Sequence, residues 1–169
     1  MERLWSPWRH AYVTRDAEPA ECVFCAAPAV AEGHSLIVHV ATTCYVILNL
    51  YPYNGGHLMV VPTRHVATLA ALRDDELVET ARVTRLAEMA LDETYRPQGM
   101  NVGINLGRPA GAGIVDHVHV HLVPRWNGDT NFMPVVGNVR VLPEDLSATA
   151  SRLRPVFARL AAASAVTIP

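Results

Sequence analysis

Three histidines alternate with hydrophobic residues in one short stretch of the chain, as His117, His119 and His121. Side chains two residues apart on a β-strand point to the same face, so a strand here would place the three imidazoles together. Four residues of strand span about 13 Å, so His117 and His121 cannot readily bind one ion together. A neutral imidazole is nucleophilic near pH 7 and can also stabilise charge by hydrogen bonding. The pattern therefore predicts a chemical face on which the three histidines divide the work.

Two other interpretations of these histidines stay open at the level of sequence. The imidazoles could simply form the polar face of an edge strand. Three histidines at alternate positions make this interpretation weaker than it would be for a single histidine. Alternatively, an adjacent His-x-His pair with a third ligand could hold a catalytic metal ion that keeps one position for water. That interpretation keeps the stretch functional but changes the mechanism.

Cys22 and Cys25 form a Cys-x-x-Cys pattern, which has the spacing of metal ligands. One such pair supplies two of the four ligands of a structural zinc site, so two more must come from elsewhere. A redox-active pair and two reduced core thiols are the competing interpretations. Three cysteines are too few for a disulfide framework, and Cys44 lies in an apolar run that predicts a core position.

Length, charge and hydropathy limit the class of protein. A chain of 169 residues, 50% of them hydrophobic, fits one domain with its own core. A net charge of -2 provides no basic field for a nucleic-acid polymer. Met1–His10 lacks the apolar stretch of a secretory signal, and no segment reaches the roughly 18 apolar residues of a membrane-spanning helix. We therefore expect a cytoplasmic protein that does not bind membranes.

The elements that must position these residues follow from hydrophobic periodicity and from turn residues. Tyr51–Gly56 collects proline, asparagine and glycines and predicts a loop, and the glycine-rich stretch Gly107–Asp116 predicts a linker. Locally paired strands with separate helices favour an α+β domain built on an antiparallel sheet. Five strands are predicted, over residues 35–40, 44–50, 57–62, 100–106 and 117–124.

Two helices are predicted. The first runs from Asp74 to about Tyr95, where proline and glycine are absent and acidic residues crowd the start. The second follows Pro143, and Pro155 should kink it or mark a second start. The apolar positions are Val83, Leu86, Ala87 and Ala90 in the first helix and Leu146, Ala150, Leu153, Phe157 and Leu160 in the second.

The stretch His117–Val123 resembles the signature of the histidine triad (HIT) family, in which histidines alternate with hydrophobic residues. Gly56–His65 is similar to an earlier strand of the family. Val46–Pro52 is similar to the segment of the family that leads to the nucleoside-binding site. Leu4–Arg9, the Cys-x-x-Cys and Pro124–Phe132 resemble a bacterial branch of dinucleoside polyphosphate phosphorylases and hydrolases. The resemblance implies a histidine triad α+β fold with a five-stranded antiparallel sheet, a long helix and a C-terminal helix.

The resemblance also implies how the chain is organised. It covers roughly residues 22 to 126, and we expect a single histidine triad domain over 1–169. This domain would carry an N-terminal arm over about 1–20 and a helical extension over about 143–163. A homodimer is the assembly that the resemblance implies.

Roles for individual residues also come from the resemblance. It implies that His119 attacks the α-phosphorus of a nucleotide and carries a covalent nucleotidyl group until an acceptor takes it. His57 and His121 would flank the phosphate and stabilise its developing charge. Asn49 stands where the family reads the ribose hydroxyls, and an amide can donate or accept there. The implied nucleotide-binding residues are Asn49, Asn105, Gly111, Gly113, His119 and His121.

One segment departs from the family pattern. Many members carry a glutamine, serine or threonine shortly before the triad that assists the leaving group, whereas this chain has Gly111-Ala112-Gly113-Ile114. Asn105 is the predicted substitute. Glycines in this loop permit close backbone approach to phosphates, although a flexible connection is the plain alternative.

In zinc-containing relatives, the positions that match His65 and His117 complete a site with two cysteines and two histidines. The resemblance therefore implies a zinc ion held by Cys22, Cys25, His65 and His117. Four protein ligands leave no position for water, so this zinc would be structural.

The activity that the resemblance favours is cleavage of a dinucleoside polyphosphate, with diadenosine tetraphosphate as the preferred substrate. Phosphate or water would accept the nucleotidyl group, and Asn105 and Trp126 slightly favour phosphate. A nucleoside phosphoramidate hydrolase is the nearest alternative enzyme. A non-catalytic nucleotide-binding zinc module is an alternative of another class.

Overall fold

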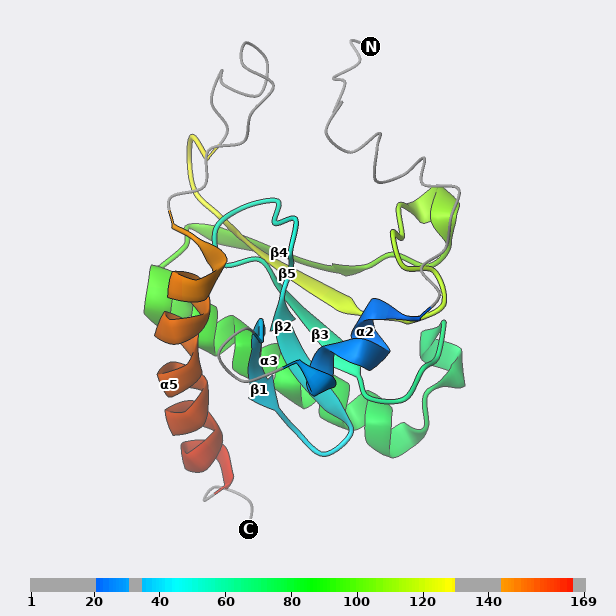
Figure 1. Cartoon of the computed structure of the whole chain (residues 1–169). Coiled ribbons are helices and arrows are strands. Elements are labelled where there is room, and N and C mark those ends of the chain that lie inside the picture. The colour runs from blue at the N-terminus through cyan, green and yellow to red at the C-terminus, as the bar shows by residue number, and fades with distance from the viewer. Residues whose placement is uncertain (1–20, 31–34, 130–143, 166–169) are drawn as a thin grey trace, which may run out of the picture.

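The computed structural model describes residues 21–30, 35–129 and 144–165, and the predicted N-terminal arm lies outside these ranges (Figure 1). Its centre is a five-stranded sheet in which every pairing is antiparallel, in the order β1-β2-β3-β5-β4. The predicted α+β class and the five-stranded sheet are therefore confirmed. The strands are β1 (Ile37–Val40), β2 (Cys44–Leu48), β3 (Leu58–Pro62), β4 (Gly99–Ile104) and β5 (Val120–Arg125).

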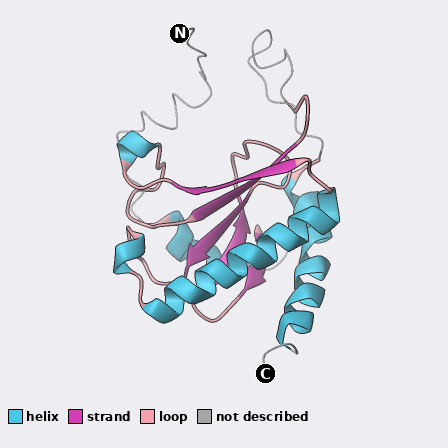
Figure 2. Ribbon diagram, turned by 180° about the vertical axis from the view of Figure 1, so that it is seen from behind, coloured by secondary structure: helices cyan, strands magenta, loops and turns pink. Residues whose placement is uncertain are grey.

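Two long helices pack on the same face of the sheet (Figure 2). Helix α3 (Asp74–Tyr95) has the predicted bounds, and all four of its predicted core residues are buried. Helix α5 (Leu146–Ala165) runs through Pro155, so no second helix begins there. Leu153 and Phe157 flank the proline and are both fully buried, and their packing holds the helix together across it. None of the described helices is long and apolar enough to cross a membrane.

The opposite face of the sheet has a much smaller cover. The one-turn helix α2 (Val23–Ala26) and the 3-10 turn η1 (Ala27–Ala29) lie over it. A second apolar cluster under this cover contains Phe24, Tyr45, Met59 and Val61. Cys44 is fully buried and belongs to the larger core on the helical face, as predicted. The rest of this second face is left for the polar residues of the candidate site.

The loop before β3 depends on a glycine. Gly56 has a φ of +75°, and a Cβ there would lie 3.2 Å from side-chain atoms of Leu91 and Tyr95. A side chain would therefore meet both backbone strain and crowding. This turn brings His57 to the start of β3.

The start of the last strand differs from the prediction. β5 begins at Val120, so His117 and His119 precede the strand. The pairings with β3 and β4 both end at Val120, and the backbone before that point bonds elsewhere. The Val118 N–H donates to the carbonyl of Val66, outside the sheet. The expectation that the strand begins at His117 is therefore wrong, because the chain joins the sheet only at Val120. The three imidazoles still share one side, since the ring of His119 lies against that of His121 and Phe24 contacts both His117 and His119.

Candidate active site

Three histidines that lie on or directly before two adjacent strands meet on the face of the sheet opposite α3 and α5. His57 precedes β3, His119 precedes β5, and His121 lies on β5 opposite Met59. Nε2 of His57 lies 3.0 Å from Nδ1 of His121, and the ring centres of His119 and His121 are 4.7 Å apart. The structure therefore brings together the three histidines that the sequence proposed for catalysis.

A chain of hydrogen bonds assigns the protons of two of these rings. The Tyr53 N–H donates to Nδ1 of His57 at 3.1 Å, so that nitrogen must be an acceptor. In a neutral ring the proton is then on Nε2, and Nε2–H of His57 donates to Nδ1 of His121. By the same rule neutral His121 carries its proton on Nε2. His121 can therefore present a donor to a bound anion.

His119 has the opposite tautomer. Its Nδ1–H donates to the backbone carbonyl of His117 at 2.8 Å, so Nε2 carries the lone pair. Its side chain is buried, and this burial lowers its pKa, an effect that the hydrogen bond to the carbonyl partly offsets. A neutral ring with a lone pair on Nε2 is the form needed for attack on phosphorus.

Phe24 covers this ring, and sequence reasoning missed it. Its ring centre lies 4.9 Å from that of His119 and 5.5 Å from that of His117. The Tyr45 hydroxyl donates to the Phe24 carbonyl at 2.6 Å and ties the short helix to the sheet. The signal that could have found Phe24 is an aromatic residue between two metal-ligand cysteines.

The predicted nucleotide-binding residues take different positions around the histidines. Asn49 follows β2, its N–H donates to the His57 carbonyl, and its side-chain oxygen accepts from Tyr51 N–H at 2.9 Å. Asn105 follows β4 and lines a hollow beside His121. Gly111 ends the 3-10 turn η3 (Arg108–Ala110) with a φ of +92°, and its N–H donates to Arg108.

Gly113 is exposed in the same loop, between β4 and His117. The roles of these asparagines and glycines in binding a nucleotide remain predictions.

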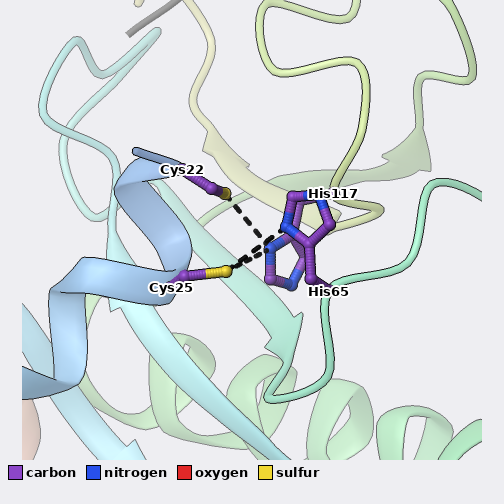
Figure 3. A group of neighbouring side chains, drawn as sticks. All are labelled: Cys22, Cys25, His65 and His117. Atoms are coloured by element: carbon purple, nitrogen blue, oxygen red, sulfur yellow. Dashed lines mark hydrogen bonds between the residues drawn. The ribbon is translucent and has the colours of Figure 1, made fainter. Parts of the chain in front are cut away.

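A second group contains the four residues expected to bind zinc, and Figure 3 shows that they face one another. Cys22 and Cys25 come from α2 and the residue before it, His65 from the loop after β3, and His117 from the segment before β5. Their ligand atoms all lie within 4.8 Å of one another. Nδ1 of His117 is 3.3 Å from Sγ of Cys22, and Nδ1 of His65 is 3.3 Å from Sγ of Cys25.

The donor set fits a tetrahedral zinc ion. Zinc–sulfur bonds of about 2.3 Å and zinc–nitrogen bonds of about 2.0–2.1 Å place ligand atoms about 3.5 Å apart. Nε2–H of His117 donates to the Pro62 carbonyl at 2.8 Å, which leaves the Nδ1 lone pair directed at the thiols. His119 is not a member of this group. The alternative of an adjacent His-x-His pair on one catalytic metal therefore has no support from this geometry.

The hollow beside His121 has a volume of about 280 Å³, and sequence reasoning did not anticipate most of its lining. Tyr53 stacks on His57 with ring centres 4.9 Å apart, and Arg125 lies at the end of β5. Asn101 and Gly103 contribute from β4. Arg125 stands in the Pro124–Phe132 stretch that resembles the bacterial branch, and that position was its only sequence signal.

Comparisons with known proteins agree with this geometry. The HIT domain family model matches residues 30–128. The chain is 42% identical over 168 residues to the AP-4-A phosphorylase of Mycobacterium tuberculosis (strain ATCC 25618 / H37Rv), covering 94% of this chain and 86% of that protein.

Two solved structures are also similar to this chain. The crystal structure of a Zn-bound histidine triad family protein from Mycobacterium smegmatis has a TM-score of 0.67 and 30% identity, covering 84% of this chain and 96% of that one. A hypothetical histidine triad nucleotide-binding protein from Sulfolobus tokodaii has a TM-score of 0.67 and 26% identity, covering 82% and 93% of the two chains.

Proposed function

The chain belongs to the HIT domain family, and on this premise we propose that it cleaves a dinucleoside polyphosphate through a nucleotidyl group on His119. The observation that carries the proposal is the tautomer of His119, whose Nδ1–H is held by the His117 carbonyl while Nε2 keeps its lone pair. Similarity to an AP-4-A phosphorylase supports diadenosine tetraphosphate as the substrate.

The proposed reaction has two displacements at the α-phosphorus. First, Nε2 of His119 bonds to phosphorus, the bond to the bridging oxygen breaks, and ATP leaves as an anion. Second, an oxygen of inorganic phosphate bonds to the same phosphorus, the phosphorus–nitrogen bond breaks, and ADP leaves. The His117 carbonyl would stabilise the positive charge of the nucleotidylated ring, and Nε2–H of His121 the negative charge on the phosphate.

The departure at Gly111–Ile114 favours this substrate over a phosphoramidate. The four residues have no side chain that donates a proton. An amine leaving group needs such a proton, whereas a terminal phosphate, with a second pKa of about 6, leaves readily as an anion. Asn105 beside His121 remains the proposed polar contact to the departing phosphate.

The metal proposed for Cys22, Cys25, His65 and His117 is a structural zinc ion. Four protein donors close the tetrahedron, so the ion would fix α2 against the segment before β5 and supply no reactive water. A Zn-bound structure among the similar histidine triad proteins supports this metal.

We further propose a cytoplasmic homodimer of single-domain protomers, with the arm at about 1–20 and the extension at about 143–163. β4 is an edge strand of the sheet. Val102 on this strand is 51% exposed, and Leu106 just beyond it is 45% exposed. An apolar edge that pairs with no further strand among the described residues is a surface suited to a second copy.

The test is incubation of the purified protein with diadenosine tetraphosphate, with and without phosphate, followed by nucleotide separation. ADP plus ATP that appear only with phosphate support phosphorolysis. AMP plus ATP would instead identify water as the acceptor, and two ADP molecules would identify symmetric hydrolysis. No cleavage, with His119→Ala protein giving the same chromatogram, would contradict the proposal.

A further inference from the structure

The hollow beside His121 contains one formal charge among the described residues that line it. That charge is on Arg125, because the other lining side chains are apolar, amide, phenol or imidazole groups. For an anion that enters the hollow, Arg125 is therefore the cationic hydrogen-bond donor among the described lining residues, beside neutral donors.

Arg125 is held in a defined orientation. Its Nε and Nη2 donate to the two carboxylate oxygens of Asp129 at 2.6 and 2.9 Å, and its Nη1 donates to Asn101 at 3.2 Å. Of the five N–H donors of a guanidinium, these bonds use three and leave one on each terminal nitrogen. Two such neighbouring donors match the spacing of two phosphate oxygens.

Asp129 does not cover the outward side of this arginine. Its carboxylate side chain is 8% exposed, whereas that of Arg125 is 46% exposed. Asp129 also accepts from Asn54 at 2.9 Å and from the Trp126 N–H at 3.2 Å, so its acceptor sites are directed into the protein. The carboxylate thus fixes the orientation of the guanidinium, which stays protonated, and does not cover its exposed edge.

The other wall of the hollow is open. Gly103 pairs with His121, and a Cβ built on Gly103 meets no atom within 4 Å. The hollow measures about 280 Å³, close to the lower end of the roughly 300–1,000 Å³ of pockets that enclose a drug-sized ligand. It therefore has room for phosphate groups.

We propose that this hollow is a phosphate subsite on the far side of the cleaved bond, with Arg125 as the residue that recognises its occupant. The inference rests on the proposed function, because His121 would mark the position of the reacting phosphate. The occupant is a phosphate group from one of two sources. It is either the distal phosphates of the dinucleotide or the inorganic phosphate that accepts the nucleotidyl group.

The first test uses steady-state kinetics on Arg125→Gln combined with Asp129→Asn, which removes both charges without leaving a buried carboxylate unpaired. The matched control is Arg159→Gln with Glu93→Gln, an exposed pair that joins α5 to α3 on the helical face. We expect the KM for dinucleotide or for phosphate to rise at least tenfold, while kcat stays within about threefold. The control should change neither constant.

The substrate whose KM rises identifies the source. A higher KM for diadenosine tetraphosphate assigns the hollow to the distal phosphates, and a higher KM for phosphate assigns it to the acceptor. Unchanged values for both substrates would overturn the subsite.

A second measurement separates this inference from the proposed function. Calorimetric titration of the full chain with inorganic tripolyphosphate, and separately with phosphate, requires no turnover. We expect wild-type protein to bind at least one of them ten times more tightly than the double variant does. That difference without any cleavage would contradict the proposed function and still support the subsite, whereas equal binding, or none to wild type, would overturn the subsite.

Gly103→Val provides an independent variant if the double variant does not fold. Gly103 has no positive φ, and the added methyl groups project into the open space of the hollow. The Arg125–Asp129 pair stays in place, yet the same loss of binding is expected because the space is filled. Full retention of tripolyphosphate and phosphate binding in this variant would also overturn the proposal.

Discussion

His117 and His119 are two residues apart and donate hydrogen bonds to backbone carbonyls from different ring nitrogens. His117 donates Nε2–H to the Pro62 carbonyl and turns its Nδ1 toward two thiols, whereas His119 donates Nδ1–H to the His117 carbonyl and keeps a lone pair on Nε2. The ring of His117 belongs to a group of four possible metal ligands, whereas the ring of His119 packs against His121, which lines the hollow. The hydrogen-bond partner of an imidazole, more than its place in a motif, therefore decides its chemistry.

The largest expected effect concerns the nucleophile. His119→Ala should lower turnover of diadenosine tetraphosphate by about four orders of magnitude or more, because the reaction path is lost together with one contact. Affinity for a non-hydrolysable dinucleotide should stay within about tenfold, or 1.4 kcal/mol. Zinc content should be unchanged, since His119 lies outside the metal group. An active variant would require direct attack by phosphate or water.

His57→Ala should have the next largest effect. This residue acts through Nε2–H, which donates to His121 and holds its tautomer. Loss of one such electrostatic contact typically costs about 10²–10³ in kcat. A slow enzyme with normal zinc content is expected in single-turnover kinetics. If the variant turned over as fast as the wild type, His57 would have no part in catalysis.

Asn49→Ala should have a smaller effect, mainly on KM. If the side chain contacts the ribose, its loss should raise KM about tenfold, which corresponds to about 1.4 kcal/mol, with kcat little changed. Arg159→Gln with Glu93→Gln is again the matched control, because this exposed pair joins α5 to α3 on the helical face. A drop in kcat at constant KM would place Asn49 with the reacting groups and not with the ribose.

The smallest expected effect on turnover comes from replacing a proposed zinc ligand, which tests whether the group that contains His117 is structural. Cys22→Ser should lose zinc and about 3 kcal/mol of stability, which lowers Tm by about 6–12 °C for a chain of this length. Turnover per folded molecule should fall less than fivefold. Metal analysis of wild-type protein should give about one zinc per chain. A folded variant without turnover would instead indicate that the metal is catalytic.

Much of the fold follows from local pattern. The bounds of α3 match the run without proline or glycine, and its buried residues match the helical repeat, because periodicity reports directly which face is covered. The start of β5 could not be predicted in the same way. His117-Val118-His119 alternates like a strand, but whether it pairs depends on how far β3 and β4 extend, which is a property of the sheet.

In the candidate site, too, features of local sequence could be predicted and features that depend on tertiary contacts could not. The Cys-x-x-Cys and the triad are visible in sequence because their spacing is short and their residue types are few. Arg125 was missed because one arginine at a strand end has no periodic signal. Its orientation depends on Asp129 and Asn101, and the second of these lies on another strand. Phe24 was missed for a similar reason, because its contact with His119 requires α2 to fold over the sheet.

The central claim is the covalent step on His119, and rapid chemical quenching tests it most directly. Protein mixed with dinucleotide labelled at the α-phosphorus, without phosphate, should be quenched in alkali because a phosphorus–nitrogen bond to imidazole hydrolyses readily in acid. We expect label on the peptide that contains His119, formed at least as fast as turnover and lost once phosphate is added, and none in His119→Ala protein. Turnover by wild-type protein without any labelled peptide would contradict it.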